Sequence, residues 1–173
     1  MPIALVAQGN DSGGMICRLG WGDMVFCFFS SVSYNLEGPG KWGTRFPRLL
    51  QDLCDCGIVE NEHFDELRQE LYTVRVELQD YPLSAAVYDI ADPSIPIPWE
   101  VIPGEENNNL AQPWVTPRSG TSYFDCFEEL MQWAENIHAP LRLMLSREAF
   151  AEKFTDNCKK GRDYFKSDVP EHH

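Results

Sequence analysis

The sequence contains no long apolar run and few basic residues, and both shortages exclude classes of function. The longest uninterrupted apolar run, residues 24–29, is far shorter than the roughly 18 residues that a membrane-spanning helix needs. Lysine and arginine number 14 against 27 aspartate and glutamate residues, and the net charge of -13 argues against binding to nucleic acids or anionic membranes. The N-terminus also lacks the basic region of a signal peptide. We therefore expect a cytoplasmic protein that attracts basic partners.

Catalytic motifs are also scarce. Only four histidines occur, and the sequence contains no G-x-G-x-x-G, no P-loop and no H-E-x-x-H motif. Residues 11–14 (DSGG) match the nucleophile motif of trypsin-like proteases, but no histidine precedes them, so we interpret them as a tight turn. A small hydrolase stays open as an alternative, in which Asp89 and Asp92 would meet a histidine in one pocket. The candidate histidines are His63 and His138.

The cysteines are expected to be thiols and not disulfides, since the chain is mid-sized and lacks the marks of a secreted protein. Only Cys54 and Cys56 suggest metal chemistry, with His63 nearby. A structural zinc ion needs four ligands, whereas this spacing supplies two from cysteine. We therefore expect no metal site and no cofactor. The six cysteines are Cys17, Cys27, Cys54, Cys56, Cys126 and Cys158.

Length and composition predict a single domain over residues 1–173. A chain of 173 residues, 43% of them hydrophobic, can bury one core but is too short for two ordinary domains. The apolar patterns predict strands at 3–7, 15–19, 85–90 and 141–145, and helices at about 24–37, 46–57, 62–80, 123–137 and 146–161. The first two strands form a hairpin, and strands and helices do not alternate strictly, which favours the α+β class. We expect one mixed sheet of four to five strands, about five helices mainly on one face, and a disordered tail at 162–173.

Residues 92–117 are predicted to form a long irregular loop because they contain six prolines. Loops of this length in compact domains are usually functional or disordered. Trp42 and Trp99 each follow a turn signal beside an apolar segment, so both rings are expected to be largely buried. An adaptor that binds a housekeeping partner through this loop is a second alternative function.

The predicted helix at 62–80 carries an acidic stripe. Its apolar residues recur at spacings of three and four, which defines one buried face opposite the stripe. At about 100° per residue, the acidic residues fall within a sector of roughly 80°. Arg68 and Arg75 lie on a flank, so we expect the stripe to be unneutralised and to point away from the core. It is either a solvated face or an electrostatic docking surface. The stripe comprises Glu62, Glu66, Glu70, Glu77 and Asp80.

Two groups of motifs resemble the immunity protein 70 family of bacterial polymorphic-toxin systems. The first is residues 28–37 (FFSSVSYNLE) followed by residues 41–47 (KWGTRFP). The second is residues 88–93 (YDIADP), the Pro-Trp pair at 98–99, and the predicted helix that begins at Ser122. The motifs follow one another in the family's order and at plausible spacing.

The resemblance covers about residues 20–145 and implies a small α+β bacterial protein that binds a cognate toxin and protects its producer. It implies no catalytic residue, and it supplies no binding site that can be transferred. The charge suggests a basic toxin, such as a nuclease, that docks by electrostatic steering. The candidate contacts are the stripe and three glutamates of the long loop. These residues are Glu62, Glu66, Glu70, Glu77, Asp80, Glu100, Glu105 and Glu106.

Overall fold

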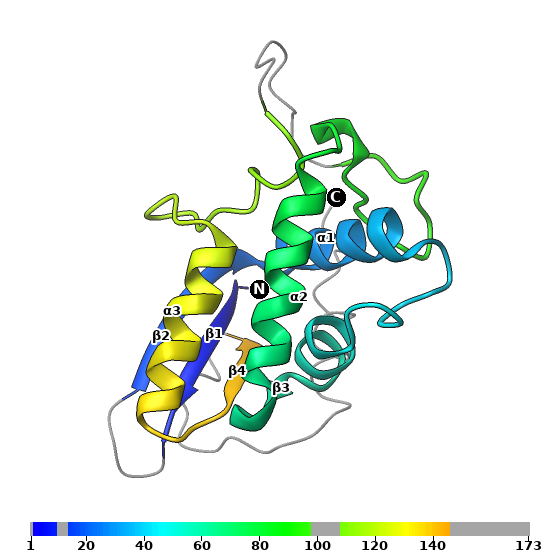
Figure 1. Ribbon diagram of the computed structural model, residues 1–173. Coiled ribbons are helices and arrows are strands. Elements are labelled where there is room, and N and C mark those ends of the chain that lie inside the picture. The colour runs from blue at the N-terminus through cyan, green and yellow to red at the C-terminus, as the bar shows by residue number, and fades with distance from the viewer. Residues whose placement is uncertain (1, 10–13, 98–107, 146–173) are drawn as a thin grey trace.

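The computed structural model describes residues 2–9, 14–97 and 108–145, which form an α+β fold (Figure 1). One sheet contains four strands in the order β2-β1-β4-β3. The strands are β1 (Pro2–Gln8), β2 (Gly14–Trp21), β3 (Ile58–Val59) and β4 (Leu141–Leu145). All three pairings are antiparallel, so the expected class is confirmed but the expected mixed sheet is wrong. A sequence pattern predicts strands, but it does not show in which direction distant strands pair.

The helices gather mainly on one face of the sheet (Figure 1). The longer ones are α1 (Gly22–Val32), which continues as η1 (Ser33–Glu37), then η2 (Arg48–Cys56), α2 (Phe64–Leu78) and α3 (Tyr123–Asn136). Two single turns, η3 (Asn61–His63) and η4 (Leu83–Ala85), complete the set among the described residues. The helix expected at 146–161 and the tail at 162–173 lie outside the described residues. No described helix is long and apolar enough to span a membrane.

The strand predicted at 85–90 is wrong. Only η4 at its start is regular, and the following backbone bonds to side chains of the first helix instead of to a neighbouring strand. The backbone N–H of Val87 donates to Ser31 Oγ at 2.8 Å, and Asn35 Nδ2 donates to the Ala85 carbonyl at 2.9 Å. Because side chains satisfy these backbone groups, the apolar segment packs in the core without joining the sheet.

The core lies between the sheet and the helices. Strand β1 is buried on both faces, and its residues Ile3, Leu5 and Ala7 belong to the main cluster under the helices. An aromatic group centred on Phe28 joins α1 to the segment before α3 and to the first residue of α3, with ring distances of 5.5 Å to Trp114 and 5.7 Å to Tyr123. These contacts fix the position of α3 on the sheet.

The two tryptophans that were expected to be largely buried have different outcomes. Trp42 packs against the edge of the core with intermediate exposure, which agrees with the expectation without complete burial. Its indole Nε1 donates to Asp55 Oδ2 at 3.0 Å, which keeps one edge of the ring near the surface. Trp99 lies outside the described residues.

Candidate protein-binding surface

Helix α2 is in contact with another helix along each of its two long edges. Helix η2 packs against one edge, and α3 lies antiparallel along the other (Figure 1). The predicted buried face of α2 is confirmed, because each of the five apolar residues on that face is at most 5% exposed. This leaves only the outermost side of α2, which we call the apex, facing solvent. The buried residues are Phe64, Leu67, Leu71, Val74 and Leu78.

Three members of the acidic stripe bind neighbouring elements at the η2 edge. Both carboxylate oxygens of Glu70 accept backbone N–H groups at the start of η2, from Arg48 at 3.1 Å and from Leu49 at 2.8 Å. Glu66 accepts from Arg48 Nε at 2.8 Å. Glu77 pairs with Arg45 at 2.6 Å. The stripe therefore holds η2 and the segment before it against α2.

The expectation of an unneutralised stripe is wrong for Glu66, Glu70 and Glu77, because each of them has a hydrogen-bond or ion-pair partner. The physical reason is that η2 begins against this edge, and the first N–H groups of a helix have no partner within it. A carboxylate from another helix satisfies them and also interacts favourably with the positive end of the helix dipole. Glu62 and Asp80, at the two ends of the stripe, are exposed, and so is Glu66 beside Arg48.

Two carboxyl groups one turn apart have pKa values that shift in opposite directions. The hydrogen bond from Arg48 lowers the pKa of Glu66 below its ordinary value. Burial raises the pKa of Glu70, and this effect outweighs the opposing effect of the two backbone N–H groups. The difference follows from position, because Glu66 lies in solvent beside a cation whereas Glu70 lies partly beneath η2.

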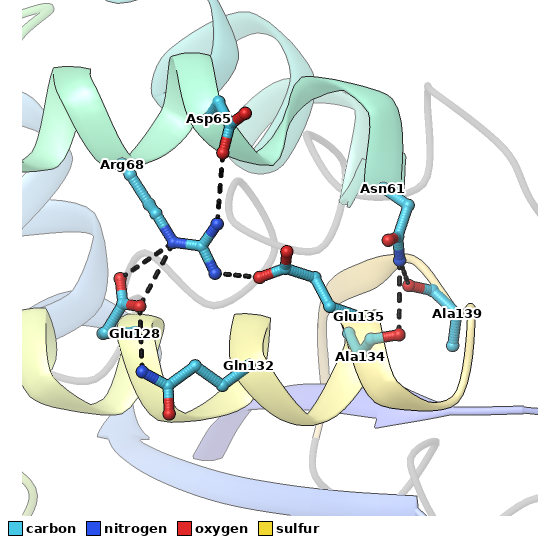
Figure 2. A network of polar contacts seen from close by, with 8 residues as sticks. All are labelled: Asn61, Asp65, Arg68, Glu128, Gln132, Ala134, Glu135 and Ala139. Atoms are coloured by element: carbon cyan, nitrogen blue, oxygen red, sulfur yellow. Dashed lines mark hydrogen bonds and ion pairs between the residues drawn. The ribbon is translucent and has the colours of Figure 1, made fainter.

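At the α3 edge, one arginine of α2 binds three carboxylates (Figure 2). Arg68 Nε lies 3.1 Å and 3.2 Å from the two carboxylate oxygens of Glu128, and its other nitrogens bond to Glu135 and, at 3.3 Å, to Asp65. The hydrogen bond to Glu135 raises the pKa of the Arg68 guanidinium above its ordinary value. Three carboxylates around one cation leave the seam between α2 and α3 with an excess of negative charge.

Two further contacts close the same seam. Asn61 Nδ2 donates to the carbonyls of Ala134, at 3.3 Å, and Ala139, which ties the turn before α2 to the C-terminal end of α3 (Figure 2). At the opposite end, Arg75 pairs with Asp125 at 3.1 Å. The two helices are therefore joined along their whole contact.

The apex of α2 exposes an apolar pair that contributes little to folding. Tyr72 is 67% exposed and Val76, one turn later, is 45% exposed. Two turns before Tyr72 lies Asp65, whose side chain is 99% exposed. An exposed tyrosine has the character of a binding hot spot, because its ring offers a large contact area at low entropic cost. We define the apex surface as Asp65, Tyr72 and Val76 of α2, together with Glu62 in the turn η3 before the helix and Asp80 just after it.

Periodicity did not single out Tyr72 and Val76, although a signal was present. The inward positions of α2 are already filled by its apolar face, so any further large apolar residue on this helix must lie at an edge or in solvent. The remaining candidate contacts, Glu100, Glu105 and Glu106, lie outside the described residues.

The residues of the alternative hydrolase are not brought together by any contact among the described residues. Asp89 Oδ1 accepts the backbone N–H of Ala91 at 2.8 Å, so it stabilises its own turn, and Asp92 does the same for the N–H of Ser94 at 3.2 Å. His63 instead lies beside Glu62 and Glu66. Within the same part of the chain, no group of three or more possible ligands is placed to hold a metal ion.

The domain exposes a tyrosine and a valine one turn apart on α2, and exposed apolar side chains of this kind are common at protein interfaces. A family model gives a narrower assignment: the model described as immunity protein 70 matches residues 12–143, and the chain belongs to this family. Its broad role is therefore that of an immunity protein that acts against a toxin. No curated protein matches the chain, and no solved structure matches it either.

Proposed function

We propose that this protein neutralises a cognate bacterial toxin by forming a stoichiometric complex with it in the bacterial cytoplasm. Membership of the immunity protein 70 family supports the protective role. Neutralisation by binding needs no catalytic residue in the immunity protein; it needs a surface that the toxin recognises. The observation that carries this proposal is the exposure of Tyr72 and Val76, one turn apart on the outer side of α2.

We place the toxin contact on the apex surface of α2. Tyr72 projects from a helix that is held on its inner face and along both edges, so the ring is presented from a rigid support. Rigid presentation favours affinity because little conformational freedom is lost on binding. Val76 extends the apolar centre by one helical turn, and Glu62, Asp65 and Asp80 provide a charged rim. An apolar centre inside a polar rim is the usual arrangement of protein interfaces.

The charge of the molecule favours a basic toxin. The net charge is -13, and the neighbouring seam has three carboxylates around Arg68. Such a field accelerates the encounter with a positively charged partner and opposes nucleic acids. A nuclease toxin fits this description, because it must itself carry positive charge to bind phosphate backbones. Glu66, Glu70 and Glu77 would contribute to the field but not to direct contact, whereas Glu100, Glu105 and Glu106 would form a second contact region.

The test is co-expression with the toxin encoded by the neighbouring gene, followed by calorimetry on the purified pair. We expect rescue of growth and a one-to-one complex. Tyr72→Ala should weaken the complex by about 30-fold, which corresponds to about 2 kcal/mol for a hot-spot residue. Ile95→Ala is a matched control, since Ile95 is an exposed apolar residue on a different segment and is 37% exposed.

Two results would contradict the proposal. Rescue by far less than one equivalent of the protein would indicate turnover instead of stoichiometric binding. Equal affinities for Tyr72→Ala and Ile95→Ala would remove the apex surface as the contact, even if the complex itself forms. Unfolding curves of both variants, expected to match the parent within about 0.5 kcal/mol, ensure that affinity and not folding is compared.

A further inference from the structure

Two cysteines that are far apart in the sequence lie in the same interface of the fold. Cys17 is on β2, an outer strand of the sheet, and Cys126 is near the start of α3, which packs on β1 and β2. Cys126 belongs to the main core cluster, and Cys17 packs against that cluster. Both are free thiols. Neither belongs to the apex surface, so the proposed contact with a toxin does not use them.

A hydrogen bond beside these cysteines fixes how α3 lies on β2. The Tyr123 hydroxyl donates to the Leu19 carbonyl at 3.1 Å, and both side chains are buried in the core. Cys17 lies two residues before Leu19, so its side chain is on the same, helix-facing side of the strand. Cys126 lies three residues after Tyr123, so it is on the same face of α3, about one turn further along. The register of helix on strand therefore places the two thiols opposite each other.

The two thiols interact directly, and they differ in reactivity. The hydrogen bond between them lowers the pKa of Cys17, whereas the same hydrogen bond, together with burial, raises the pKa of Cys126. Cys17 is half-buried, so a molecule as small as a peroxide can reach it, while Cys126 is only 1% exposed. The thiolate is the nucleophilic form of cysteine. Cys17 is therefore the reactive member of the pair, and Cys126 is a second thiol held beside it.

We propose that Cys17 and Cys126 are a modification site, at which hydrogen peroxide converts the two thiols into a reversible disulfide. The Cys17 thiolate attacks one peroxide oxygen, and the O–O bond breaks. The products are a sulfenic acid on Cys17 and hydroxide, which takes up the proton that Cys17 lost and becomes water. The Cys126 sulfur then attacks the Cys17 sulfur, the S–O bond breaks, and the hydroxyl group leaves with the Cys126 proton as a second water. The thiols lose two electrons, and the peroxide gains them.

The disulfide joins β2 to α3 and stabilises the folded protein under oxidising conditions. It closes a loop of about 110 residues, and a cross-link over a loop of this length strongly restricts the unfolded chain. Helix α3 also holds one edge of α2, because Glu128 and Glu135 bind Arg68. Oxidation therefore preserves the support of the apex surface. Because neither cysteine is part of that surface, this proposal and the proposed toxin contact can fail independently.

The test treats the reduced full chain with hydrogen peroxide and maps its thiols by alkylation and peptide mass spectrometry. We expect a peptide pair that joins Cys17 to Cys126, lighter than the two reduced peptides by two hydrogen atoms, and its loss on treatment with dithiothreitol. Cys126→Ser should stop the reaction at the Cys17 sulfenic acid, which dimedone labels, and Cys17→Ser should give neither product. Cys56→Ser is the matched control, because Cys56 is also half-buried but lies in η2, and this variant should form the cross-link as the parent does.

Urea unfolding provides a second measurement. The oxidised parent should unfold at a higher urea concentration than the reduced parent, whereas Cys17→Ser should have the same midpoint with and without peroxide. Three outcomes would overturn the proposal: oxidation of Cys17 to the sulfinic acid without a cross-link, a cross-link from Cys17 to a different cysteine, or an unchanged midpoint in the cross-linked protein. Peptide mapping of the parent chain needs no substitution, so this result does not depend on the folding of any variant.

Discussion

The two edges of α2 and its apex carry similar polar residues, but these residues have different roles. At the edges, Glu70 and Arg68 bond to η2 and α3, and their side chains are partly buried. At the apex, Tyr72 and Asp65 lie largely in solvent. Polar side chains of α2 therefore stabilise the fold where a second helix is within reach. Where no second helix is within reach, they are available to bind a partner protein. Variants at the edges should change folding, whereas variants at the apex should change binding.

The largest effect is expected at the α3 edge. Arg68→Met removes the cation that three carboxylates share, and we expect the free energy of unfolding to fall by about 2 kcal/mol, since hydrogen bonds between charged groups contribute about 1.5–3 kcal/mol each and this site is partly exposed to solvent. Arg75→Met is the control, because Arg75 forms one exposed pair with Asp125 and should cost less than about 1 kcal/mol. Urea unfolding measures both. Equal losses would show that the shared guanidinium has no special role.

A smaller loss of stability is expected at the η2 edge. Glu70→Ala removes the acceptor of two backbone N–H groups at the start of η2, and helix caps of this kind contribute about 0.5–2 kcal/mol. Glu62→Ala, at an exposed position in the turn η3 just before this helix, should change stability by no more than about 0.5 kcal/mol. If the two variants unfold at the same urea concentration, Glu70 does not cap η2.

At the apex, charge reversal is expected to act on the rate of association. Glu62→Lys combined with Asp80→Lys should slow association with a basic toxin several-fold at low salt, and the difference should vanish as salt screens it. Glu129→Lys is compared with each of these two reversals made singly and reports the effect of the same change of net charge, because Glu129 lies on the Cys17 side of α3. Stopped-flow rates that fall equally for both changes would exclude a specific role of the apex. Reversal of Glu66 and Glu70 is unsuitable for this test, since Glu70 supports η2.

Much of the fold could be predicted from local patterns. The opening hairpin, the buried face of α2 and the Ser122 cap, whose hydroxyl accepts from the Phe124 N–H at 3.2 Å, all follow from the sequence around them. Strand β3 was missed because two residues are too few to form a pattern. The segment 85–90 misled because its alternation resembles that of a strand, whereas Ser31 and Asn35, about 50 residues away, supply its hydrogen bonds.

The candidate surface was less predictable, because it depends on what lies beside α2. Periodicity placed Glu66 and Glu70 correctly on one side of the helix, but periodicity describes a helix in isolation. That η2 would begin against this side is a property of tertiary packing. Tyr72 could have been found from the sequence, since it is a large aromatic residue outside the buried face of its helix.

The smallest expected effect separates two carboxylates at the η2 edge by their response to pH. Glu66 has a lowered pKa in the folded protein, so its contribution is present above the unfolded value of about 4.3 and is lost as pH falls through the folded pKa. Glu70 has a raised pKa, so the folded state binds its proton more tightly, and its effect on stability declines as pH rises from about 4.3 through the folded pKa. Glu66→Gln should therefore reduce the fall in the free energy of unfolding as the pH is lowered into the acid range. Glu70→Gln should reduce the fall in the free energy of unfolding that occurs as the pH rises through the folded pKa of Glu70.

Urea unfolding at pH values from about 3 to 7 measures both slopes. A second variant identifies the main cause for Glu66, because Arg48 contributes most to lowering its pKa and His63 contributes less. In the Arg48→Met background, Glu66→Gln should alter the acid limb much less, while Glu70→Gln should keep part of its effect, since burial beneath η2 remains. If Glu66→Gln flattens the acid limb equally with and without Arg48, the ion pair does not link these helices in solution. The η2 edge would then resemble the apex in its electrostatics, and the contrast between them would rest on Glu70 alone.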